Sequence, residues 1–288
     1  MMAKIGIIGG SGLYKVDGIS GIKEIKLETP FGLPSDNFIT GKIDGFEVVF
    51  LPRHGRSHDV IPSDINYRAN IYGMKNLGVE KIVSFGACGS LKENIKPGDF
   101  LIPDQLVDRT NSGRRATFFG EGIVAHIPFA EPFCNELRKV VYDRALEAGI
   151  ATHNKGTYIN IEGPAFSTKA ESHLYRSWGM DVIGMTNLVE AKLAREAEIC
   201  YCTVAMVTDY DCWYPGHESV TVEMIVECMN KNSSKARNLV KTIVPELAKR
   251  KRACQCGNAL ATSIITPKEA VPGATLKKLD IIIGKYLK

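Results

Sequence analysis

Two carboxylates follow the apolar run Val204–Val207 and have the spacing of an acid pair. Asp209 and Asp211 are separated only by Tyr210. If the run is a buried strand, its period of two directs both carboxyls to one side of the strand's end. Like charges held that close do not ionise together easily, so one pKa should rise and that carboxyl would carry a proton near neutral pH. The pair would then offer a base-like ligand one donor and one acceptor, although aspartates that merely solvate a loop would look the same.

A basic cluster follows a second predicted strand, Val48–Leu51, in the sequence PRHGRSHD. Arg53 carries a planar fork of N–H donors that suits a phosphate, and His54 stands beside it. A solvated basic loop would contain the same residues. The cluster therefore indicates an anion site only if other anion-binding groups lie at the ends of neighbouring strands.

Glycine-rich turns after two further strands provide such groups. The strand Ile5–Ile8 leads into GGSGLY, where glycines let backbone amides approach an anion and Ser11 adds a hydroxyl. The strand in KIVSFGACGS closes in the same way on Gly86 and Ala87. The first turn contains G-x-G, but Lys15 stands where the dinucleotide fingerprint has its third glycine, so an NAD-binding oxidoreductase remains only an alternative.

These groups need strands whose ends lie side by side, and the hydrophobic pattern supplies them. Apolar strands alternate with amphipathic helices along most of the chain, which indicates one α/β domain with ligands at the strand ends. Thr168 and Glu171 form a capping box that should start a helix, and Pro245 should break the long helical region from Ser219 to Lys251. Further strands are predicted at Gly156–Ile161, Val182–Gly184 and Cys200–Val207, and further helices at Asn66–Leu77, Glu131–Ala148 and residues 185–198.

Length and composition are those of a globular chain. Its 288 residues are enough for a sizeable core, with 44% hydrophobic and 24% charged residues. The net charge is only +4 and the basic residues are dispersed as far as the run Lys249–Arg252, which should end a helix, so nucleic-acid binding is not expected. The N-terminal MMAKIGIIGG is not a signal peptide and no apolar run reaches transmembrane length, which favours a cytoplasmic protein without membrane contact.

The 8 cysteines include two C-x-C pairs, Cys200/Cys202 and Cys254/Cys256. Paired zinc ligands usually stand two to four residues apart, so this spacing predicts no metal site. A thiol-redox protein is a second alternative, but neither pair follows the C-x-x-C pattern of such proteins. Reduced thiols are the default in a cytosol, and the sequence leaves disulfides open.

Seven motifs then establish a family resemblance. GIIGGSGL, RHGRSHDVIPSDINYRAN, FGACGS, HIPFAEPFC, IEGPAFSTKAES, MTNLVEAKLARE and VTDYDCW occur in that order between Ile5 and Leu247. The chain resembles the 5'-methylthioadenosine phosphorylases of the trimeric purine nucleoside phosphorylase superfamily. An ordered set of this kind is far more specific than any one of its motifs, and it favours the ligand-binding interpretation of each.

The resemblance implies a nucleoside phosphorylase fold: a single α/β domain with a twisted mixed central β-sheet flanked by helices. That domain would span residues 5–250, and residues 251–288 would form a C-terminal extension with the second C-x-C, packed on the same domain. A homotrimer or a hexamer with active sites near subunit interfaces is implied as well. The reaction would be phosphorolysis of methylthioadenosine to adenine and 5-methylthioribose 1-phosphate, with inorganic phosphate as co-substrate and no metal or organic cofactor. A broader purine nucleoside phosphorylase or a methylthioinosine phosphorylase is the alternative.

Matching positions carry the family's site residues. Phosphate would be held by Ser11, Arg53, His54, Gly86, Ala87 and Thr186. Met185 would lie against the ribose, and the base would contact Phe166, Asp209, Tyr210 and Asp211. Ser167 and Val222 match positions that shape substrate choice, and Ile225 would help Val222 enclose a 5'-methylthio group. His126, in the irregular segment Asn111–Phe129, would reach a neighbouring subunit's site. Gly86 departs from the threonine of other members and loses a side-chain donor, whereas Ser11 replaces a threonine and keeps the hydroxyl.

The acid pair gives this resemblance a mechanism. Cleavage of an N-glycosidic bond leaves negative charge on the departing purine, and a protonated Asp209 would donate to its N7 while Asp211 supports that proton or the exocyclic amine. A carboxylate accepts from a 6-amino group but opposes a 6-oxo group. The sequence therefore predicts a preference for 6-aminopurines of an order of magnitude or more, from about 1–3 kcal/mol of unpaired polar groups.

Overall fold

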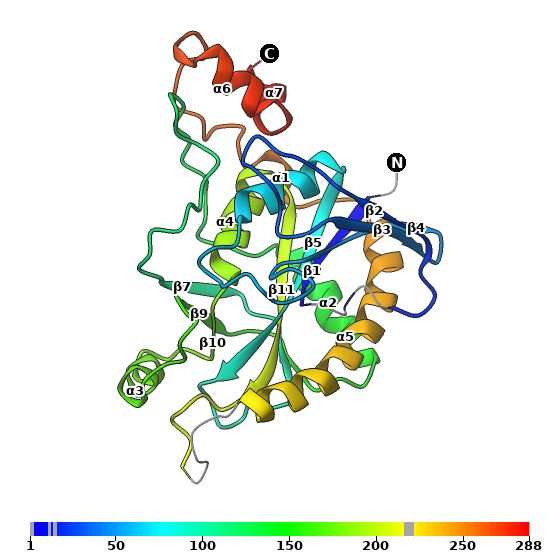
Figure 1. Ribbon diagram of the computed structural model, residues 1–288, viewed down its shortest axis with the longest axis vertical. Coiled ribbons are helices and arrows are strands. Elements are labelled where there is room, and N and C mark those ends of the chain that lie inside the picture. Colours follow the sequence, from blue (N-terminus) through cyan, green and yellow to red (C-terminus); the bar gives the residue numbers. More distant parts are fainter. Residues whose placement is uncertain (1–2, 11–12, 14–15, 216–221, 288) are drawn as a thin grey trace.

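A mixed β-sheet runs through the molecule and carries helices on both faces (Figure 1). The computed structural model describes residues 3–10, 13, 16–215 and 222–287. The strands in this part of the chain are β1 (Lys4–Gly9), β2 (Ser20–Ile25), β3 (Phe38–Ile43), β4 (Phe46–Pro52), β5 (Val79–Ser90), β6 (Phe100–Leu101), β7 (Gln105–Arg109), β8 (Thr152–His153), β9 (Thr157–Ile161), β10 (Val182–Gly184) and β11 (Cys200–Asp209). The helices are α1 (Tyr67–Asn76), α2 (Asn135–Glu147), α3 (Lys169–Ser177), α4 (Asn187–Glu196), α5 (Val222–Lys249), α6 (Gly273–Lys278) and α7 (Asp280–Leu287), with short 3-10 turns η1 (Gln255–Asn258) and η2 (Lys268–Ala270).

Strand β5 is the centre of the sheet. On one edge, the first part of β5 pairs with β1 and its last residues pair with β10. On the other edge, β5 pairs with β11 along most of the length of β5. The sheet order is β2-β3-β4-β1-β5-β10-β9-β7, and β11 extends it separately through β6 to β8. Because β4, β1, β5 and β11 are parallel neighbours, their carboxyl ends meet at one edge, which is where α/β sheets bind ligands.

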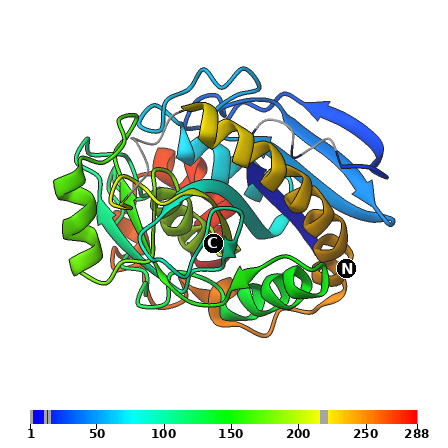
Figure 2. The same ribbon diagram turned by 90° about the horizontal axis from the view of Figure 1, so that it is seen from below.

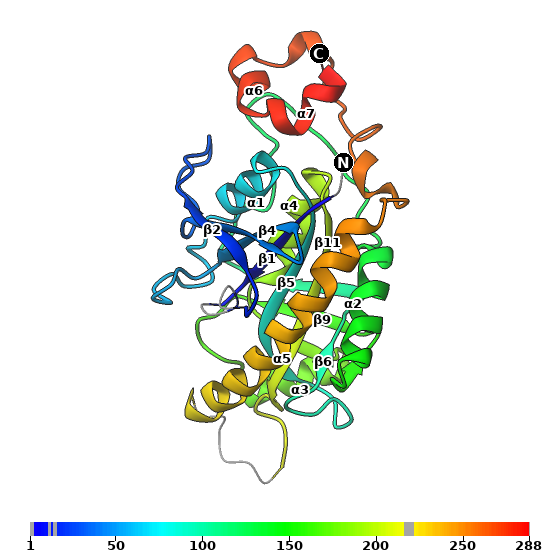
Figure 3. The same cartoon turned by 90° about the vertical axis from the view of Figure 1, so that its right-hand side faces the viewer.

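Each face of the sheet has its own apolar core. Helices α2 and α5 cover one face, where Phe85 and Val204 of the sheet pack in the same cluster as Val141 and Leu239 of the helices. Helices α1 and α4 lie on the other face, as the side view shows (Figure 3). Seen from below, α2 in green and α5 in gold flank the sheet together, and α3 stands at the opposite edge (Figure 2).

Local sequence signals fix two of the helix starts. Asn66 caps α1, because its side chain accepts a hydrogen bond from the amide of Ala69. The capping box predicted at Thr168 and Glu171 is present at the start of α3, with both reciprocal bonds formed. The amphipathic patterns therefore placed these elements, and the capping residues set where they begin.

Helix α2 begins at Asn135, later than the predicted Glu131. Phe133 is buried and stacks on Tyr201 at a centroid distance of 6.1 Å, and the extended Cys134 donates its amide to the Tyr201 carbonyl at 2.8 Å. The chain is thus held against β11 before the helix can start. Tertiary packing overrides the pattern at this position.

Pro245 does not break α5, contrary to the prediction. The helix is continuous from Val222 to Lys249 with Pro245 inside it. Residues on both sides of the proline, including Val240, Val244 and Leu247, are buried in the core with α2. This burial holds the helix together where the proline removes one of its backbone hydrogen bonds.

The segment after Lys251 packs on the same molecule. Leu260, Val271 and Ile282 are buried in the core of α1 and α4. The buried carboxylate of Glu198, just before β11, accepts bonds from the Leu260 amide at 3.0 Å and the Tyr286 hydroxyl at 2.5 Å. The division into residues 5–250 and an extension 251–288 stays a prediction. Within the described ranges, none of the helices combines the length and apolar character needed to span a bilayer.

Candidate active site

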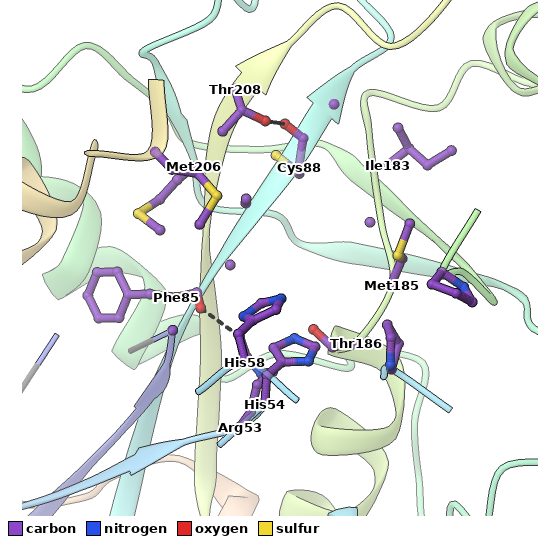
Figure 4. Close-up of a pocket in the computed structure, with 18 of the residues that line it drawn as sticks. Arg53, His54, His58, Phe85, Cys88, Ile183, Met185, Thr186, Met206 and Thr208 are labelled. Atoms are coloured by element: carbon purple, nitrogen blue, oxygen red, sulfur yellow. Dashed lines mark hydrogen bonds between the residues drawn. The ribbon is translucent and has the colours of Figure 1, made fainter. Parts of the chain in front are cut away.

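A cavity of about 450 Å³ opens at the carboxyl ends of the central strands (Figure 4). Strands β5, β9, β10 and β11 contribute residues to its lining, together with the segment that follows β4, the residues just before α4 and the first half of α5. The cavity brings together most of the residues predicted from sequence: Arg53, His54, Gly86, Ala87, Phe166, Ser167, Met185, Thr186, Asp209 and Asp211. The strand ends therefore meet as the alternation of strands and helices predicted.

Arg53 follows β4 and is only 3% exposed. Its Nε donates to Glu190 Oε1 at 2.7 Å and its Nη2 to Glu190 Oε2 at 3.1 Å, while Nη1 donates to the Phe85 carbonyl at 2.7 Å. Nη2 also donates to the Ser84 hydroxyl. Burial opposes the charge, but the carboxylate of Glu190 outweighs it and raises the pKa of Arg53. The guanidinium is therefore fully charged and held in place.

This pairing changes the part that Arg53 can play. From the sequence, all the N–H donors of the Arg53 guanidinium were expected to be available to an anion. In the structure, four of the five donate to protein groups. The remaining donor is on Nη1, the atom that would lie 3.7 Å from a Cβ at Gly86. Arg53 thus presents one N–H beside the Gly86 backbone, and its charge is balanced by a buried carboxylate.

His54 is a neutral hydrogen-bonding group. Its Nδ1 lies 2.8 Å from the Val60 carbonyl, which can only accept, so the proton sits on Nδ1 and Nε2 is left as an acceptor. Burial, reinforced by the nearby charge of Arg53, lowers the pKa of His54 to about 4. Its ring stacks on His58 at 4.6 Å. Such an imidazole suits the protonated oxygen of a hydrogen phosphate.

Thr186 brings a hydroxyl and a helix terminus to the same end of the cavity. It holds the N-cap position of α4, yet its side chain makes no capping bond and lines the cavity instead. The amides and the dipole at the start of α4 favour an anion there. Arg53, His54, Gly86, Ala87 and Thr186 therefore line one cavity, and beside them lies a buried carboxylate, Glu190, that the sequence did not reveal. Their role in binding an anion stays a prediction.

Asp209 ends β11 at the other end of the cavity, opposite Gly89 of β5. Its Oδ1 accepts the amide of Asp211 at 2.7 Å, and its Oδ2 lies 2.7 Å from the hydroxyl of Thr208. Thr208 also lies 3.2 Å from the Cys88 carbonyl. Burial raises the pKa of Asp209. When Asp209 is protonated it can donate to Thr208, which then donates to Cys88, so both charge states are accommodated.

The two aspartates share the cavity for reasons that differ from the prediction. Asp211 lies beyond the strand, in the left-handed region with φ of 52°, so a turn and not strand alternation points it inward. Burial is the main reason that the pKa of Asp211 rises to about 6, and the charge of Asp209 adds to it. Gly89 makes room for the pair, because a Cβ there would lie 2.9 Å from Asp209 Oδ1.

Apolar side chains form the walls between the two ends. Figure 4 shows Met185 and Ile183 on one side of the cavity and Met206 and Phe85 on the other. The Met185 backbone is fixed, because its carbonyl accepts from Arg114 and from Asn160 at 3.2 Å. From Gly86 to Gly89 a strand advances about 10 Å, at roughly 3.3 Å per residue, which is the span of a nucleoside with an anion at its sugar.

The mouth of the cavity carries the predicted aromatic and serine. Phe166 is 55% exposed and lies at the rim, free to cover a flat ring. The hydroxyl of Ser167 is buried and has no hydrogen-bond partner in the described part of the chain. Ser167 therefore offers a donor and an acceptor to whatever occupies the cavity.

Two predicted residues lie elsewhere. Tyr210 was assigned to the base, but its ring stacks on Tyr214 at 4.5 Å and its hydroxyl lies 3.3 Å from the Glu93 carbonyl, so it does not line the cavity. Tyr210 is the first residue after β11, and its packing against Tyr214 and Trp213 keeps the ring out of the cavity. His126 is exposed on the segment that leads to α2, outside this cavity. Ser11 and the side chains of Val222 and Ile225 lie outside the described residues.

Several residues that build the site were missed by the sequence analysis. The Glu190 carboxylate accepts hydrogen bonds from Arg53, from the Ser84 hydroxyl at 2.8 Å and from the Tyr201 hydroxyl at 2.8 Å. Glu162 gathers bonds from Ser112, Ser63, Arg114 and two backbone amides, which outweigh its burial and keep its pKa low. An acid in the buried stripe of a helix was the one available signal for Glu190. No comparable pattern marks Glu162.

This fold is that of the phosphorylases, and the chain belongs to the phosphorylase superfamily, whose family model matches residues 4–245. The curated relatives are more particular. A protein of Koribacter versatilis (strain Ellin345) named S-methyl-5'-thioadenosine phosphorylase is 58% identical over 99% of this chain and 97% of its own length. One of the same name from Geobacter sulfurreducens is 55% identical over 98% of this chain and 99% of its own.

Solved structures agree. A methylthioadenosine phosphorylase from an antarctic soil metagenomic library superposes with a TM-score of 0.93 at 45% identity, covering 98% of this chain and 99% of its own. The methylthioadenosine phosphorylase of Schistosoma mansoni in complex with adenine gives a TM-score of 0.82 at 36% identity, covering 90% and 96%. The resemblance and the fold class predicted from sequence are both confirmed.

Proposed function

We propose that this chain catalyses the phosphorolysis of S-methyl-5'-thioadenosine to adenine and 5-methylthio-α-D-ribose 1-phosphate. It is a pentosyltransferase of the phosphorylase superfamily and serves purine and methionine salvage. The observation that carries the proposal is the layout of one cavity, with an anion-binding end at Arg53 and Thr186 and a protonatable acid pair at Asp209 and Asp211. Between these ends there is room for a nucleoside.

The anion end would hold and orient inorganic phosphate, the co-substrate. Thr186, the amides of Gly86 and Ala87 and the free N–H of Arg53 donate to its oxygens, and His54 Nε2 accepts from the protonated one. Held on one face of the ribose, the phosphate oxygen attacks C1' as the C1'–N9 bond breaks. Its negative charge stabilises the positive charge that develops on the sugar ring.

The acid end would receive the leaving base. The electron pair of the broken C1'–N9 bond remains on the purine, and protonated Asp209 donates its proton to N7. Thr208 stabilises the carboxylate that results, because its hydroxyl can turn from the Cys88 carbonyl to Asp209 Oδ2. A proton from solvent then restores Asp209. Asp211, with a pKa of about 6, is largely ionised at neutral pH and accepts from the exocyclic amine.

Substrate choice would follow from the same groups. A 6-amino base satisfies the Asp211 carboxylate, whereas a 6-oxo base opposes it with an acceptor. Met206 and Met229 give the sugar side of the cavity an apolar character that suits a methylthio group better than a hydroxyl. Val222, Ile225 and Ser167 stay assigned to specificity on the resemblance. A broader purine nucleoside phosphorylase or a methylthioinosine phosphorylase is the rival activity.

The assembly and location form part of the proposal. We propose a cytoplasmic homotrimer, or a hexamer made from trimers, that needs neither an organic cofactor nor a metal for the reaction and binds neither nucleic acid nor membrane. The exposed position of His126 leaves it available to a neighbouring subunit's site. Ser11 would complete the phosphate site, and Phe166 would close over the base.

The decisive experiment compares four nucleosides that differ at two positions. Methylthioadenosine, adenosine, methylthioinosine and inosine are each incubated with the enzyme and phosphate, and kcat/KM is measured from release of adenine or hypoxanthine. The 6-amino substrates should exceed their 6-oxo counterparts by an order of magnitude or more, with methylthioadenosine first. If the 6-oxo substrates react as fast as the 6-amino substrates, the enzyme has the broader activity. If base release does not depend on phosphate, the reaction is not phosphorolysis.

A further inference from the structure

Four cysteines converge at a point away from the active-site cavity. The Sγ atoms of Cys134, Cys200, Cys254 and Cys256 all lie within 4.8 Å of one another, and those of Cys200 and Cys254 are 3.4 Å apart. They come from three separate segments: the residue before α2, the first residue of β11 and the turn η1 that follows α5. All four thiols are free, and three of the residues are buried.

We infer that these four thiols form a structural tetrathiolate site for one zinc ion. Zinc bound by four thiolates is tetrahedral with Zn–S bonds of about 2.3 Å, which sets the sulfur atoms about 3.8 Å apart. The Sγ–Sγ separations in the cluster, which include 3.4 Å and do not exceed 4.8 Å, lie around that value. An iron–sulfur cluster places several atoms between its thiolates and would need a wider cage.

The protein holds the thiols in place through its own hydrogen bonds. The amide of Cys134 donates to the Tyr201 carbonyl at 2.8 Å, which fixes it beside the start of β11. Arg252 donates to the Glu198 carbonyl at 2.8 Å and the amide of Ala253 to Glu136 at 3.3 Å, which brings the second C-x-C to the same place. The ligands are thus preorganised, and the ion would close the cage without moving the elements that carry it.

The charges around the cluster suit a tetrathiolate. Four thiolates and one Zn²⁺ carry a net charge of −2, which burial would make costly without cations nearby. Lys81 is 5% exposed, lines the same cavity as Cys134 and Cys200, and is anchored by the carbonyls of Leu247 and Arg250 at 2.6 Å each. A cavity of about 380 Å³ next to the cluster is lined by further cations, Lys139, Arg250 and Lys251.

Neither C-x-C pair by itself has the spacing of paired zinc ligands, so no metal site was predicted from the sequence. The first pair misleads, because Cys202 lies further along β11 and only Cys200 joins the cluster. The two remaining ligands are supplied by Cys134 and by the distant C-terminal segment. Such a site would fasten residues 251–288 to the sheet, and it makes no use of the phosphorolysis chemistry.

Metal analysis of the purified protein tests the inference. The full chain is expressed without a histidine tag in zinc-supplemented medium and purified with reductant and without chelators. Elemental analysis should find about one zinc per chain in the wild type and in Cys228→Ser, whose thiol lies on α5 and contacts the Val207 carbonyl at 3.6 Å. Cys254→Ser and Cys256→Ser should each lose most of the zinc.

A second measurement does not depend on the variants folding. Wild-type chain loaded with Co²⁺ in place of zinc should show the thiolate-to-cobalt charge-transfer bands and the intense visible bands of a tetrahedral site. Removing zinc with a strong chelator should lower the thermal midpoint of the wild type. If the wild type lacks zinc and a thiol count under denaturing conditions finds four thiols fewer than the sequence contains, the cluster forms two disulfides and the inference is overturned. Stoichiometric iron in the wild type would also overturn it, and so would zinc retained by a Cys254→Ser/Cys256→Ser double variant.

Discussion

Arg53 and Glu190 form a buried ion pair beside the cavity, at its proposed anion-binding end, with 2.7 Å between Nε and Oε1 and side chains 4% and 2% exposed. The pair joins the end of β4 to the first turn of α4, so it is both a structural contact and the support of the proposed phosphate site. Its carboxylate also collects the hydroxyls of Ser84 and Tyr201. The geometry of the anion site therefore depends on a residue that does not line the cavity.

The first prediction concerns the stability that this pair provides. Glu190→Gln leaves the Arg53 charge buried without a partner, and we expect it to lower the free energy of unfolding by about 3–5 kcal/mol. Urea denaturation followed by circular dichroism measures the change. Glu47→Gln is the matched control, because Glu47 is 60% exposed in its ion pair with Lys4 and should shift stability by less than about 0.5 kcal/mol. Similar shifts for both variants would contradict the assignment.

The same pair alters what is expected of Arg53→Ala. From the sequence, this substitution should mainly raise the phosphate concentration needed for half-maximal rate. In the structure it also leaves the Glu190 carboxylate buried and unpaired, so a loss of stability should accompany the kinetic effect. Unfolding measured beside phosphate saturation separates the two effects. An unchanged phosphate dependence in the folded fraction would remove Arg53 from the phosphate site.

The second prediction tests the general acid. Asp209→Asn keeps the size of the side chain but removes the transferable proton, and we expect kcat for methylthioadenosine to fall by about 10²–10⁴. The rate is followed by release of adenine at saturating phosphate. Asp143→Asn on the outer face of α2, where Asp143 pairs only with Lys139 of the same helix, is the control and should keep the wild-type rate. A near wild-type rate for Asp209→Asn would exclude this acid.

The strand ends, the capping box and the acid pair could be predicted because each is written in a few consecutive residues. Arg53 and Glu190, by contrast, are 137 positions apart, and their contact exists only once the fold brings the first turn of α4 beside the end of β4. The four thiols have the same character. Tyr210 shows the opposite failure, because it shares a motif with the aspartates but stacks on Tyr214 away from the cavity. Local patterns predict which elements form, and packing decides which side chains meet.

The third prediction uses two glycines of β5 as a matched pair. A Cβ at Gly89 would lie 2.9 Å from Asp209 Oδ1 and 3.3 Å from Asp211 Cβ, so Gly89→Ala should displace the acid pair. We expect kcat to fall at least tenfold, while the KM for phosphate changes little. Among the described residues, a Cβ at Gly86 would meet only Arg53 Nη1, at 3.7 Å, so Gly86→Ala should be tolerated. Equal losses in the two variants would show that the strand, and not the acid pair, is sensitive.

The fourth prediction follows from the space at Gly86. The family resemblance implies a threonine where this chain has Gly86, and the cavity leaves room for a side chain beside the Arg53 Nη1 atom. Gly86→Thr would add a hydroxyl donor to the anion end. We expect the KM for phosphate to fall by about tenfold or more, because one hydrogen bond to a charged group contributes about 1.5–3 kcal/mol, with kcat little changed. Gly86→Val has nearly the same shape without the hydroxyl, so the gain should be absent in it.

The last prediction concerns pH and stability at Asp211. Its pKa is about 6 in the folded protein and about 3.9 in an unfolded chain, so between pH 4 and pH 6 the unfolded state releases this proton first. Stability from the protonated carboxyl is therefore complete below pH 4 and is lost as the pH rises through 6. Asp211→Asn has no proton to lose at this position, so its thermal midpoint relative to wild type should rise between pH 4 and pH 7. Taking the difference between the two proteins at each pH cancels the titration of the carboxyls they share, and a difference that stays constant over this range would place the Asp211 pKa at its ordinary value and remove burial as the force that sets it.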